Sequence, residues 1–208
     1  PNHHGDEGYN FHLMYLTNTE SDDIKILPTH RLINGLRDFD QDTLIKKLEQ
    51  DFTIKPVEEA HTLAEVIAGK PWAFGLMFQQ TAYKIRLKPE ALSSMRWPFP
   101  EVIKKLDLTV MHYFIIEKAL GISGKNQRKS EHISFDRSLI DCLKKVIQQE
   151  AQLAIITNEV TMDDVKSVCH SGYTMPQKST YFYPKSICGF LFSSINEDEF
   201  KTPIYNPF

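Results

Sequence analysis

The segment Ser93-Ser-Met-Arg-Trp-Pro-Phe-Pro100 marks the point at which the pattern of the chain changes. Its prolines and serines are typical of irregular backbone. Before this segment the chain is rich in short apolar runs of strand length, and after it helical and strand-like segments alternate. The change predicts an α+β fold in one compact domain, with an antiparallel, strand-rich first part followed by alternating helices and strands.

Short apolar runs indicate strands on the N-terminal side of this break. A hairpin is expected to join residues 9–16 with residues 24–27 across a polar turn. Residues 53–57 form a short strand whose proline favours a sheet edge, because proline cannot donate to a neighbouring strand. Residues 72–78 and 82–87 are expected to form a second hairpin. The first part therefore predicts antiparallel pairing.

Helix signals dominate the second part of the chain. Residues 101–120 are expected to be mostly helical, with a closing glycine and with Asp107 as either an interior restart or the true N-cap. Ser138 and Thr161 each precede an aspartate by three residues, a spacing typical of a helix N-cap. In the first part, Asp40 or Asp42 is expected to begin another helix. The remaining expected elements are a helix at 61–68 and strands at 132–135, 153–157 and 189–195.

Composition argues against several classes of protein. The 208 residues, of which 41% are hydrophobic, are enough to bury a core without disulfides or metals. The formal net charge of −3 argues against a dedicated nucleic-acid binder. No apolar run approaches the roughly 20 residues that a membrane span needs, and no signal peptide is visible. These features favour a cytoplasmic protein, in which Cys142, Cys169 and Cys188 are reduced thiols without metal-ligand spacing.

The two ends of the chain differ in composition from the middle. Residues 1–8 are polar, and we expect them to be a flexible linker that follows a missing upstream half. Residues 9–195 are expected to form the α+β domain, with a candidate internal boundary at 93–100. Residues 196–208 form an acidic, then aromatic and proline-bearing tail. A site shared with the upstream half is then incomplete in this chain.

The segment Met175-Pro-Gln-Lys-Ser-Thr-Tyr-Phe-Tyr-Pro-Lys185 concentrates side chains that bind anions. Its prolines hold the backbone in an extended, turn-rich path. On such a path Lys178, Ser179, Thr180 and Lys185 can direct ammonium and hydroxyl donors at one anion. The segment is therefore a candidate binding loop for phosphate or carboxylate.

A second candidate lies in Pro28-Thr-His-Arg31. The Arg31 guanidinium offers a planar fork of donors that suits phosphate or carboxylate, and the Thr29 hydroxyl adds a hydrogen bond. His30 is the candidate acid/base, because imidazole exchanges protons near neutral pH. Side chains alternate along a strand, so Thr29 and Arg31 share one face and His30 takes the other. On that geometry His30 is alternatively a structural histidine, and Arg31 a structural ion-pair partner.

The two segments together predict one anion site, provided that they meet in space. Its phosphate- or substrate-binding residues would be Thr29, Arg31, Lys178, Ser179, Thr180, Tyr183 and Lys185, with His30 as the catalytic residue. Tyr183 is alternatively a packing residue, and Lys185 alternatively a solvated one. The sequence contains no Walker A loop and no metal-ligand set, so no metal is expected in this chain.

Three segments together resemble the domain-of-unknown-function family 1015. They are residues 9–33, which contain Ile-Leu-Pro-Thr-His-Arg-Leu-Ile, then Leu106-Asp-Leu108 with His112, and the 175–185 segment with Gly189. The resemblance covers about residues 5–195 and corresponds to the C-terminal half of the family's members. It implies an upstream half of the partition-protein-B and sulfiredoxin-like type, which carries an Asp-Gly-His-His-Arg box.

The resemblance also implies a function for the intact protein. The upstream half of the family is similar to free-serine kinases, so the expected activity is nucleotide-dependent phosphoryl transfer to a small hydroxy amino acid such as serine. ATP or ADP with Mg²⁺ would be the cofactors, and the upstream half and a small-molecule substrate the partners. This half alone is expected to be inactive. Two alternatives stay open: a DNA-binding protein of the partition-protein-B type, and an interaction domain without chemistry of its own.

Overall fold

The computed structural model describes residues 7, 10, 14–21, 23–176, 178–187, 189 and 192. Chain contacts divide the protein into a central unit, Lys25–Tyr183, and a terminal unit made of Pro1–Ile24 with Pro184–Phe208. The candidate boundary at 93–100 falls within the central unit. None of the helices among the described residues combines the length and apolar character that a membrane crossing requires.

The terminal unit contains a polar turn where the sequence indicates one. The Ser21 hydroxyl donates to the Asp23 carboxylate at 2.6 Å, and the Glu20 N–H donates to the Asn18 side chain at 2.9 Å. The strand predicted at 9–16 lies partly outside the described residues, and its described residues, 10 and 14–16, are not strand. The strand predicted at 189–195 and the tail at 196–208 also lie largely or wholly outside them.

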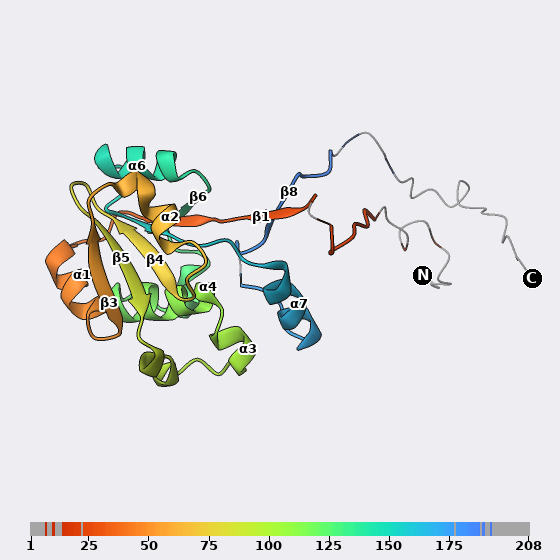
Figure 1. The fold of residues 1–208 in the computed structure, drawn as a ribbon, viewed down its shortest axis with the longest axis horizontal. Helices are drawn as coiled ribbons and strands as arrows, with labels where there is room; N and C mark the ends of the chain where they lie inside the picture. Colours follow the sequence, from red (N-terminus) through yellow and green to blue (C-terminus); the bar gives the residue numbers. More distant parts are fainter. Residues whose placement is uncertain are drawn as a thin grey trace, which may run out of the picture. The chain divides into compact units, whose positions relative to one another are not determined.

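The central unit is built around a six-stranded sheet in which every neighbouring pair of strands is antiparallel (Figure 1). The strands are β2 (His30–Ile33), β3 (Phe52–Val57), β4 (Ala73–Met77), β5 (Ala82–Leu87), β6 (Ile133–Asp136) and β7 (Leu153–Ile156). Their order across the sheet is β3-β5-β4-β7-β2-β6. The predicted α+β class, the hairpin of β4 with β5 and the edge position of the proline-bearing strand β3 are confirmed.

Helices cover both faces of this sheet (Figure 1). One face packs against α1 (Gln41–Leu48), α4 (Asp107–Val110) and the π-helix η4 (Met111–Ala119). The other face packs against α2 (Leu63–Ile67) and α6 (Leu139–Ile147). The remaining helical segments are η2 (Ala60–Thr62), η3 (Pro89–Ser94), α3 (Glu101–Lys104), α5 (Gly124–Gln127) and α7 (Met162–His170).

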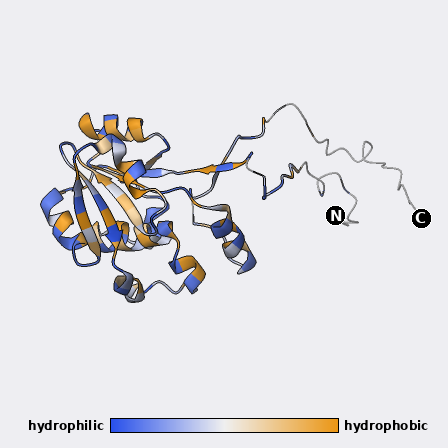
Figure 2. Ribbon diagram, viewed as in Figure 1, coloured by the Kyte–Doolittle hydropathy of each residue, from blue (hydrophilic) through white to orange (hydrophobic). Residues whose placement is uncertain are grey.

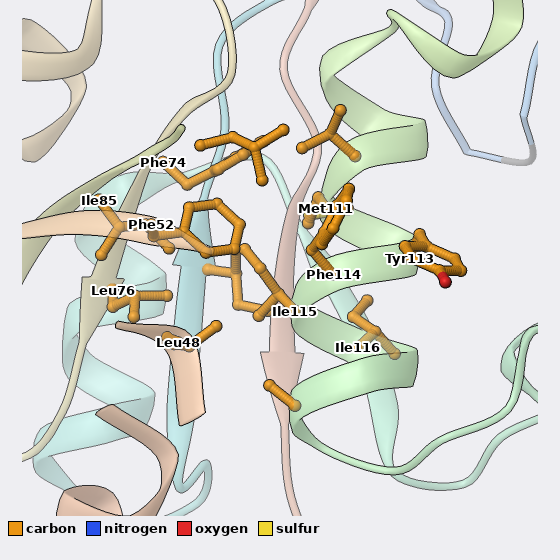
Figure 3. Packing of buried hydrophobic residues seen from close by; sticks show 14 of the residues in the cluster. Leu48, Phe52, Phe74, Leu76, Ile85, Met111, Tyr113, Phe114, Ile115 and Ile116 are labelled. Carbon is orange, nitrogen blue, oxygen red and sulfur yellow. The ribbon is translucent and has the colours of Figure 1, made fainter. Parts of the chain in front are cut away.

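Aromatic side chains hold the larger core together. Figure 3 shows Phe114 of η4 directed toward Phe52. The two rings meet edge to face with centroids 6.2 Å apart, and Phe52 also meets Phe74 at 6.4 Å. Burial of a side chain of this size contributes about 1.5–3 kcal/mol to stability. The packing fixes η4 against the sheet, and with it the position of every side chain that η4 carries.

The alternation of side chains along β2 decides which residues face which helices. Ile33 joins the core beneath η4, whereas Leu32 joins the core beneath α2 and α6. The apolar residues of α6 appear as orange stretches on its ribbon in Figure 2, and Cys142 and Val146 are its buried contacts with the sheet. By the same alternation Arg31 shares the η4 face with Ile33.

The helix starts follow the sequence closely. The Asp40 carboxylate accepts a hydrogen bond from the Thr43 N–H at 2.8 Å, and the Ser138 hydroxyl accepts one from the Asp141 N–H at 3.1 Å. Thr161 forms a reciprocal capping box with the aspartate three residues later. These caps satisfy N–H groups that a helix otherwise leaves without partners. All three predicted N-caps are confirmed.

Two elements differ in part from the sequence pattern. Among the described residues, 24–27 form no hairpin with residues 10 and 14–16, and β1 (Lys25–Leu27) pairs with β8 (Tyr181–Tyr183), with Ile26 opposite Phe182. This pairing buries Ile26. The helical region predicted at 101–120 is divided into α3 and α4, with the interior restart at Asp107 that the sequence offers and with Leu106, not Asp107, as the N-cap, and it then widens into η4. Hydrogen bonds such as that from Leu120 N–H to the Ile115 carbonyl, five residues apart, produce the wider turn.

Candidate functional site

A cavity of about 750 Å³ opens in the central unit where three chain segments meet. Its lining residues are Thr29, Phe135, Asp136, Arg137, Ser138, Lys178, Thr180 and Tyr181. We name it the Arg137–Lys178 cavity. Its volume falls within the roughly 300–1,000 Å³ of typical small-molecule sites. Three residues singled out by the sequence, Thr29, Lys178 and Thr180, therefore line one cavity.

The junction between β6 and α6 supplies one wall of this cavity. Arg137 and Ser138 connect the two elements, and Ser138 is the N-cap of α6. The N-terminus of a helix carries partial positive charge and favours anions. The guanidinium carbon of Arg137 lies 3.5 Å from the centroid of the Tyr181 ring. This stacking holds the cation against β8 while its edge donors stay available.

Asp136 is the acidic residue of the cavity lining, and other groups already satisfy its carboxylate. It accepts hydrogen bonds from Lys145 Nζ at 2.6 Å and from the Ser138 N–H at 3.0 Å. Burial alone raises the pKa of Asp136, but these hydrogen bonds outweigh burial and hold the pKa below its ordinary range. The carboxylate therefore stays ionised and balanced by Lys145, and it leaves Arg137 unpaired.

The loop before β8 supplies the opposite wall. Lys178 has a φ angle of +59°, a left-handed conformation that costs a residue with a side chain on the order of 1 kcal/mol. The buried Ser179 hydroxyl donates to the Pro176 carbonyl and so closes the loop on itself. Within the part of the chain that the structure describes, neither Lys178 nor Arg137 forms an ion pair. Two cations that form no ion pair among the described residues thus line the cavity, together with an Asp136 carboxylate that is paired with Lys145.

Arg31 lies behind the cavity wall and is fully buried. Its Nη1 donates to the Thr29 carbonyl, and its guanidinium carbon lies 5.5 Å from the ring centroid of Phe135. Both Thr29 and Phe135 line the cavity. The Arg31 Nε has no hydrogen-bond partner among the described residues. Arg31 therefore reaches the cavity only through the residues that line it.

A hydrogen-bonded chain from α5 through η4 fixes the other side of Arg31. Gln127 Nε2 donates to the carbonyls of His112 and Ile122, so its Oε1 faces His112 Nδ1 at 2.6 Å. His112 Nδ1 must then carry the proton, and its Nε2 accepts from Arg31 Nη2 at 3.3 Å. His112 is consequently a neutral acceptor for the buried guanidinium.

The pKa values describe the same arrangement. Burial, reinforced by the charge of Arg31, lowers the pKa of His112 to about 4. Burial also lowers the pKa of Arg31 from 12.5 to about 9, so the guanidinium is a cation at neutral pH. None of the ion pairs among the described residues includes Arg31. A buried positive charge without a carboxylate partner raises the electrostatic potential around it and favours an anion nearby.

His30 occupies the other face of β2 and does not line the cavity. Its Nδ1 accepts a hydrogen bond from the Thr157 N–H at 3.3 Å. Burial, and next the charge of Arg31, lower the pKa of His30 to about 4. The imidazole is therefore neutral at pH 7 and engaged in holding β2 against Thr157. The acid/base role that the sequence suggests for His30 stays a prediction.

The other residues predicted from the sequence lie outside the cavity lining. Ser179 is a structural residue of the loop, as described above. Tyr183 is half exposed and stands opposite Lys25 in the pairing of β1 with β8. Lys185 belongs to the terminal unit, which is described by itself. Their roles as ligands stay predictions.

Arg137, Ser138 and Tyr181 also line the cavity and were not predicted from the sequence as ligands. A usable signal was present, because Arg137 and Ser138 stand between a predicted strand and a predicted helix cap. Such a junction directs helix N–H groups toward the end of a sheet, which is a common anion site. The described residues contain no group of three or more His, Cys, Asp or Glu side chains that could hold a metal.

Comparison with known proteins identifies a family model and several solved structures. The model described as "Protein of unknown function (DUF1015)" matches residues 1–109. A search of curated proteins finds no match. A free serine kinase in complex with AMP is 16% identical with a TM-score of 0.46, and the alignment covers 80% of this chain and 56% of that chain.

Two further solved structures resemble the chain to a similar degree. A mutant of a free serine kinase, also in complex with AMP, is 16% identical with a TM-score of 0.46 over the same shares of the two chains. A conserved hypothetical protein from Pyrococcus furiosus is 17% identical with a TM-score of 0.47, over 80% of this chain and 59% of that chain. The chain thus spans a little more than half the length of each of these proteins.

Proposed function

Because the chain belongs to the DUF1015 family of proteins of unknown function, we propose a function from its site: the Arg137–Lys178 cavity binds a phosphate group. In the intact protein this cavity serves nucleotide-dependent phosphoryl transfer to a small hydroxy amino acid such as serine. The phosphate site is supported by the geometry of the cavity. The reaction is supported by the resemblance of the sequence to a family whose upstream half is similar to free-serine kinases.

The observation that carries the proposal is the convergence on one cavity of three hydroxyls and two cations that form no ion pair within the described part of the chain. Arg137 and Lys178 supply the charge, and the hydroxyls belong to Thr29, Ser138 and Thr180. Arginine presents parallel donors that match two phosphate oxygens, whereas lysine acts as a mobile point charge. Catalysis of phosphoryl transfer depends chiefly on positioning and on charge stabilisation of this kind.

The buried Arg31 strengthens the case for an anion. A guanidinium without a carboxylate partner is unfavourable in the free protein. An anion in the cavity would lie beyond the shared wall of Thr29 and Phe135 and would relieve that cost. We assign Arg31 a positioning role, because it also fixes the Thr29 carbonyl by direct donation.

The proposed step balances without a redox partner. The hydroxyl oxygen of the amino acid forms a bond to the terminal phosphorus of the nucleotide. The bond from that phosphorus to the bridging oxygen breaks, and the shortened nucleotide leaves with the electron pair. The hydroxyl proton passes to solvent or to a base. The described residues offer no donor set for Mg²⁺, so the proposal assigns that ion to the nucleotide and the upstream half.

The test is an assay of the full-length protein for phosphoserine formation from serine with ATP or ADP. Arg137→Ala and Lys178→Ala should each lower the rate at least about tenfold, because each removes a charge-assisted contact worth roughly 1.5–3 kcal/mol. Arg128→Ala and Lys129→Ala are the matched controls, since both residues are exposed and line neither cavity of the central unit. Equal rates in all four variants would remove the cavity from the reaction.

A further inference from the structure

A second cavity of about 600 Å³ lies in the central unit beside the first. Residues of α7, of the α3–α4 junction and of the segment after α2 contribute to its wall. Its lining carries both signs of charge, with Lys70 and Lys105 as cations and Asp107 and Glu159 among its acids. We name it the Asp107 cavity. The phosphate site described above does not use any of these residues.

We propose that the Asp107 cavity binds the acceptor of the reaction, a small α-amino acid, through its ammonium and carboxylate groups. This inference rests on the proposed function and locates the second substrate within it. The mixed charge of the lining is the first support. A zwitterion requires both an acidic and a basic group in a cavity of small-molecule size, and the lining of this cavity includes both.

Asp107 is the proposed partner of the ammonium group. Its carboxylate accepts a hydrogen bond from the Trp72 N–H at 2.8 Å, and Asn158 also bonds to it. Trp72 adopts a left-handed φ of +58°, so its N–H is held toward Asp107 at a conformational cost. None of the ion pairs among the described residues includes Asp107. A partly buried carboxylate that forms no ion pair among the described residues is a candidate partner for a ligand cation.

The electrostatics of Asp107 agree with that assignment. Burial is the main influence and raises the pKa of its carboxyl group, although the bonds from Trp72 and Asn158 oppose the shift. The nearby Asp164 adds to the rise. A ligand ammonium would offset both the burial and the like charge. Glu159, which is exposed and forms no ion pair within the described chain, adds a second negative group at the cavity.

The two lysines of the lining suit a carboxylate. Lys105 follows α3, and its exposed ion pair with Glu101 is long, at 3.9 Å. Exposed pairs of this kind contribute only about 0–1 kcal/mol, so Lys105 is readily drawn to a ligand. The Lys70 Nζ donates to the Val66 carbonyl at 2.8 Å and retains further donors.

The two cavities adjoin through one peptide unit. Pro28 lines the Asp107 cavity, and the next residue, Thr29, lines the Arg137–Lys178 cavity. The walls of the two cavities therefore meet at this peptide unit.

Calorimetric titration of the 208-residue chain with L-serine tests the inference. The wild type should bind L-serine, and it should bind N-acetylserine and serine methyl ester at least about tenfold more weakly, because each derivative removes one of the two charges. Asp107→Asn and Glu159→Gln should weaken L-serine binding, and Lys105→Met should do the same from the carboxylate side. Asp163→Asn is the matched control, because Asp163 is an exposed acid of α7 outside the cavity.

Titration of the same samples with inorganic phosphate separates this inference from the proposed function. Phosphate binding that survives in Asp107→Asn and Glu159→Gln, together with lost serine binding, would support both assignments. Phosphate binding without any serine binding by the wild type would overturn the amino-acid site and leave the phosphate site in place. Serine binding that all four variants retain unchanged would also overturn it. If Asp107→Asn does not fold, the serine affinities of Glu159→Gln and Lys105→Met still test the site, because both substitutions change exposed residues.

Discussion

At the scale of single residues, Arg31 is the feature with the largest consequence. It is fully buried, donates to the Thr29 carbonyl and contacts a neutral His112, while its Nε stays without a partner in the described chain. Buried charges are usually paired because removal from water is costly. The cost of burying this charge agrees with the positioning role proposed for Arg31 beside an anion.

This view of Arg31 predicts a stability gain from its removal. Arg31→Met keeps the length of the side chain and removes the unpaired charge, so the free energy of unfolding should stay equal or rise by about 1 kcal/mol. Phosphate affinity should fall in the same variant. Arg31→Ala, which leaves a cavity, should instead destabilise by about 2–5 kcal/mol. Chemical denaturation and phosphate titration measure the two effects, and equal destabilisation by Met and Ala would identify Arg31 as a structural anchor.

The two buried histidines predict loss of stability in acid. Burial lowers the pKa of both His30 and His112 from 6.5 to about 4. Between these values the unfolded chain binds more protons than the folded one, so the free energy of unfolding falls as the pH drops from about 6.5 toward 4. Each histidine contributes on the order of 3 kcal/mol over that window.

A mutant comparison isolates the histidine contribution from that of the carboxylates. The free energy of unfolding is measured for the wild type and for His112→Gln at pH 5 and pH 7. Between these values the free energy should change less in the variant, because unfolding of the variant takes up about one proton fewer. His61→Gln changes an exposed histidine and should retain the wild-type dependence. If the three proteins respond to pH identically, the buried state of His112 is contradicted.

Sequence reasoning at the residue scale identified Thr29, Lys178 and Thr180, because hydroxyls and cations in proline-bearing segments are visible without a structure. The environment of Arg31 could not be predicted, because alternation along a strand shows which residues share a face but not which element packs on that face. In the structure η4 packs there, and its His112 contacts Arg31 where the sequence suggested an ion-pair partner.

At the scale of elements, the junction of η4 with α5 fixes the hydrogen-bonded chain behind the site. The Glu117 carboxylate accepts from Trp97 Nε1 at 3.1 Å and from the Gly124 N–H. Gln127, three residues later, then reaches back to His112. Sequence periodicity predicted a helix here, but the widened π-helical turn depends on how the helix end packs, which a sequence pattern does not contain.

Gly124→Ala tests whether this junction is as tight as the structure shows. A Cβ atom at position 124 would lie 2.7 Å from the Trp97 ring and 3.0 Å from the Glu117 carboxylate. The variant should lose about 1–3 kcal/mol of unfolding free energy, because the ring and the backbone must move apart. Lys125→Ala, at the next exposed position, should change stability by about 0.5 kcal/mol or less. Equal stabilities in the two variants would contradict the close approach.

At the scale of the whole molecule, the site depends on contacts between segments that are far apart in sequence. The pairing of β1 with β8 brings the Pro28–Thr29 segment and the Lys178 loop together, although about 150 residues separate them. The helix caps at Asp40, Ser138 and Thr161 and the strands at 53–57, 82–87 and 153–156 are local properties, and the sequence predicts them. The pairing of β1 with β8 was not predicted, because an apolar pattern indicates a strand but does not specify a partner far away in the chain.

The composition of the protein also becomes informative at this scale. The net charge of −3 is spread over the whole chain, whereas Arg137, Lys178 and the buried Arg31 gather around one cavity. Local concentration of charge, not the total, determines where an anion binds. Arg137 was not predicted as a ligand, because a single arginine between a strand and a helix barely changes the composition or the net charge of the chain.

Calorimetric titration of the chain with inorganic phosphate at low ionic strength tests the central claim most directly. The account predicts that the wild type and Lys129→Ala bind phosphate alike, and that Arg137→Ala and Lys178→Ala each bind it about tenfold more weakly. Rising salt should weaken binding to the wild type, because the contacts are electrostatic. Absence of phosphate binding by the wild type, or equal binding by all four proteins, would contradict the account.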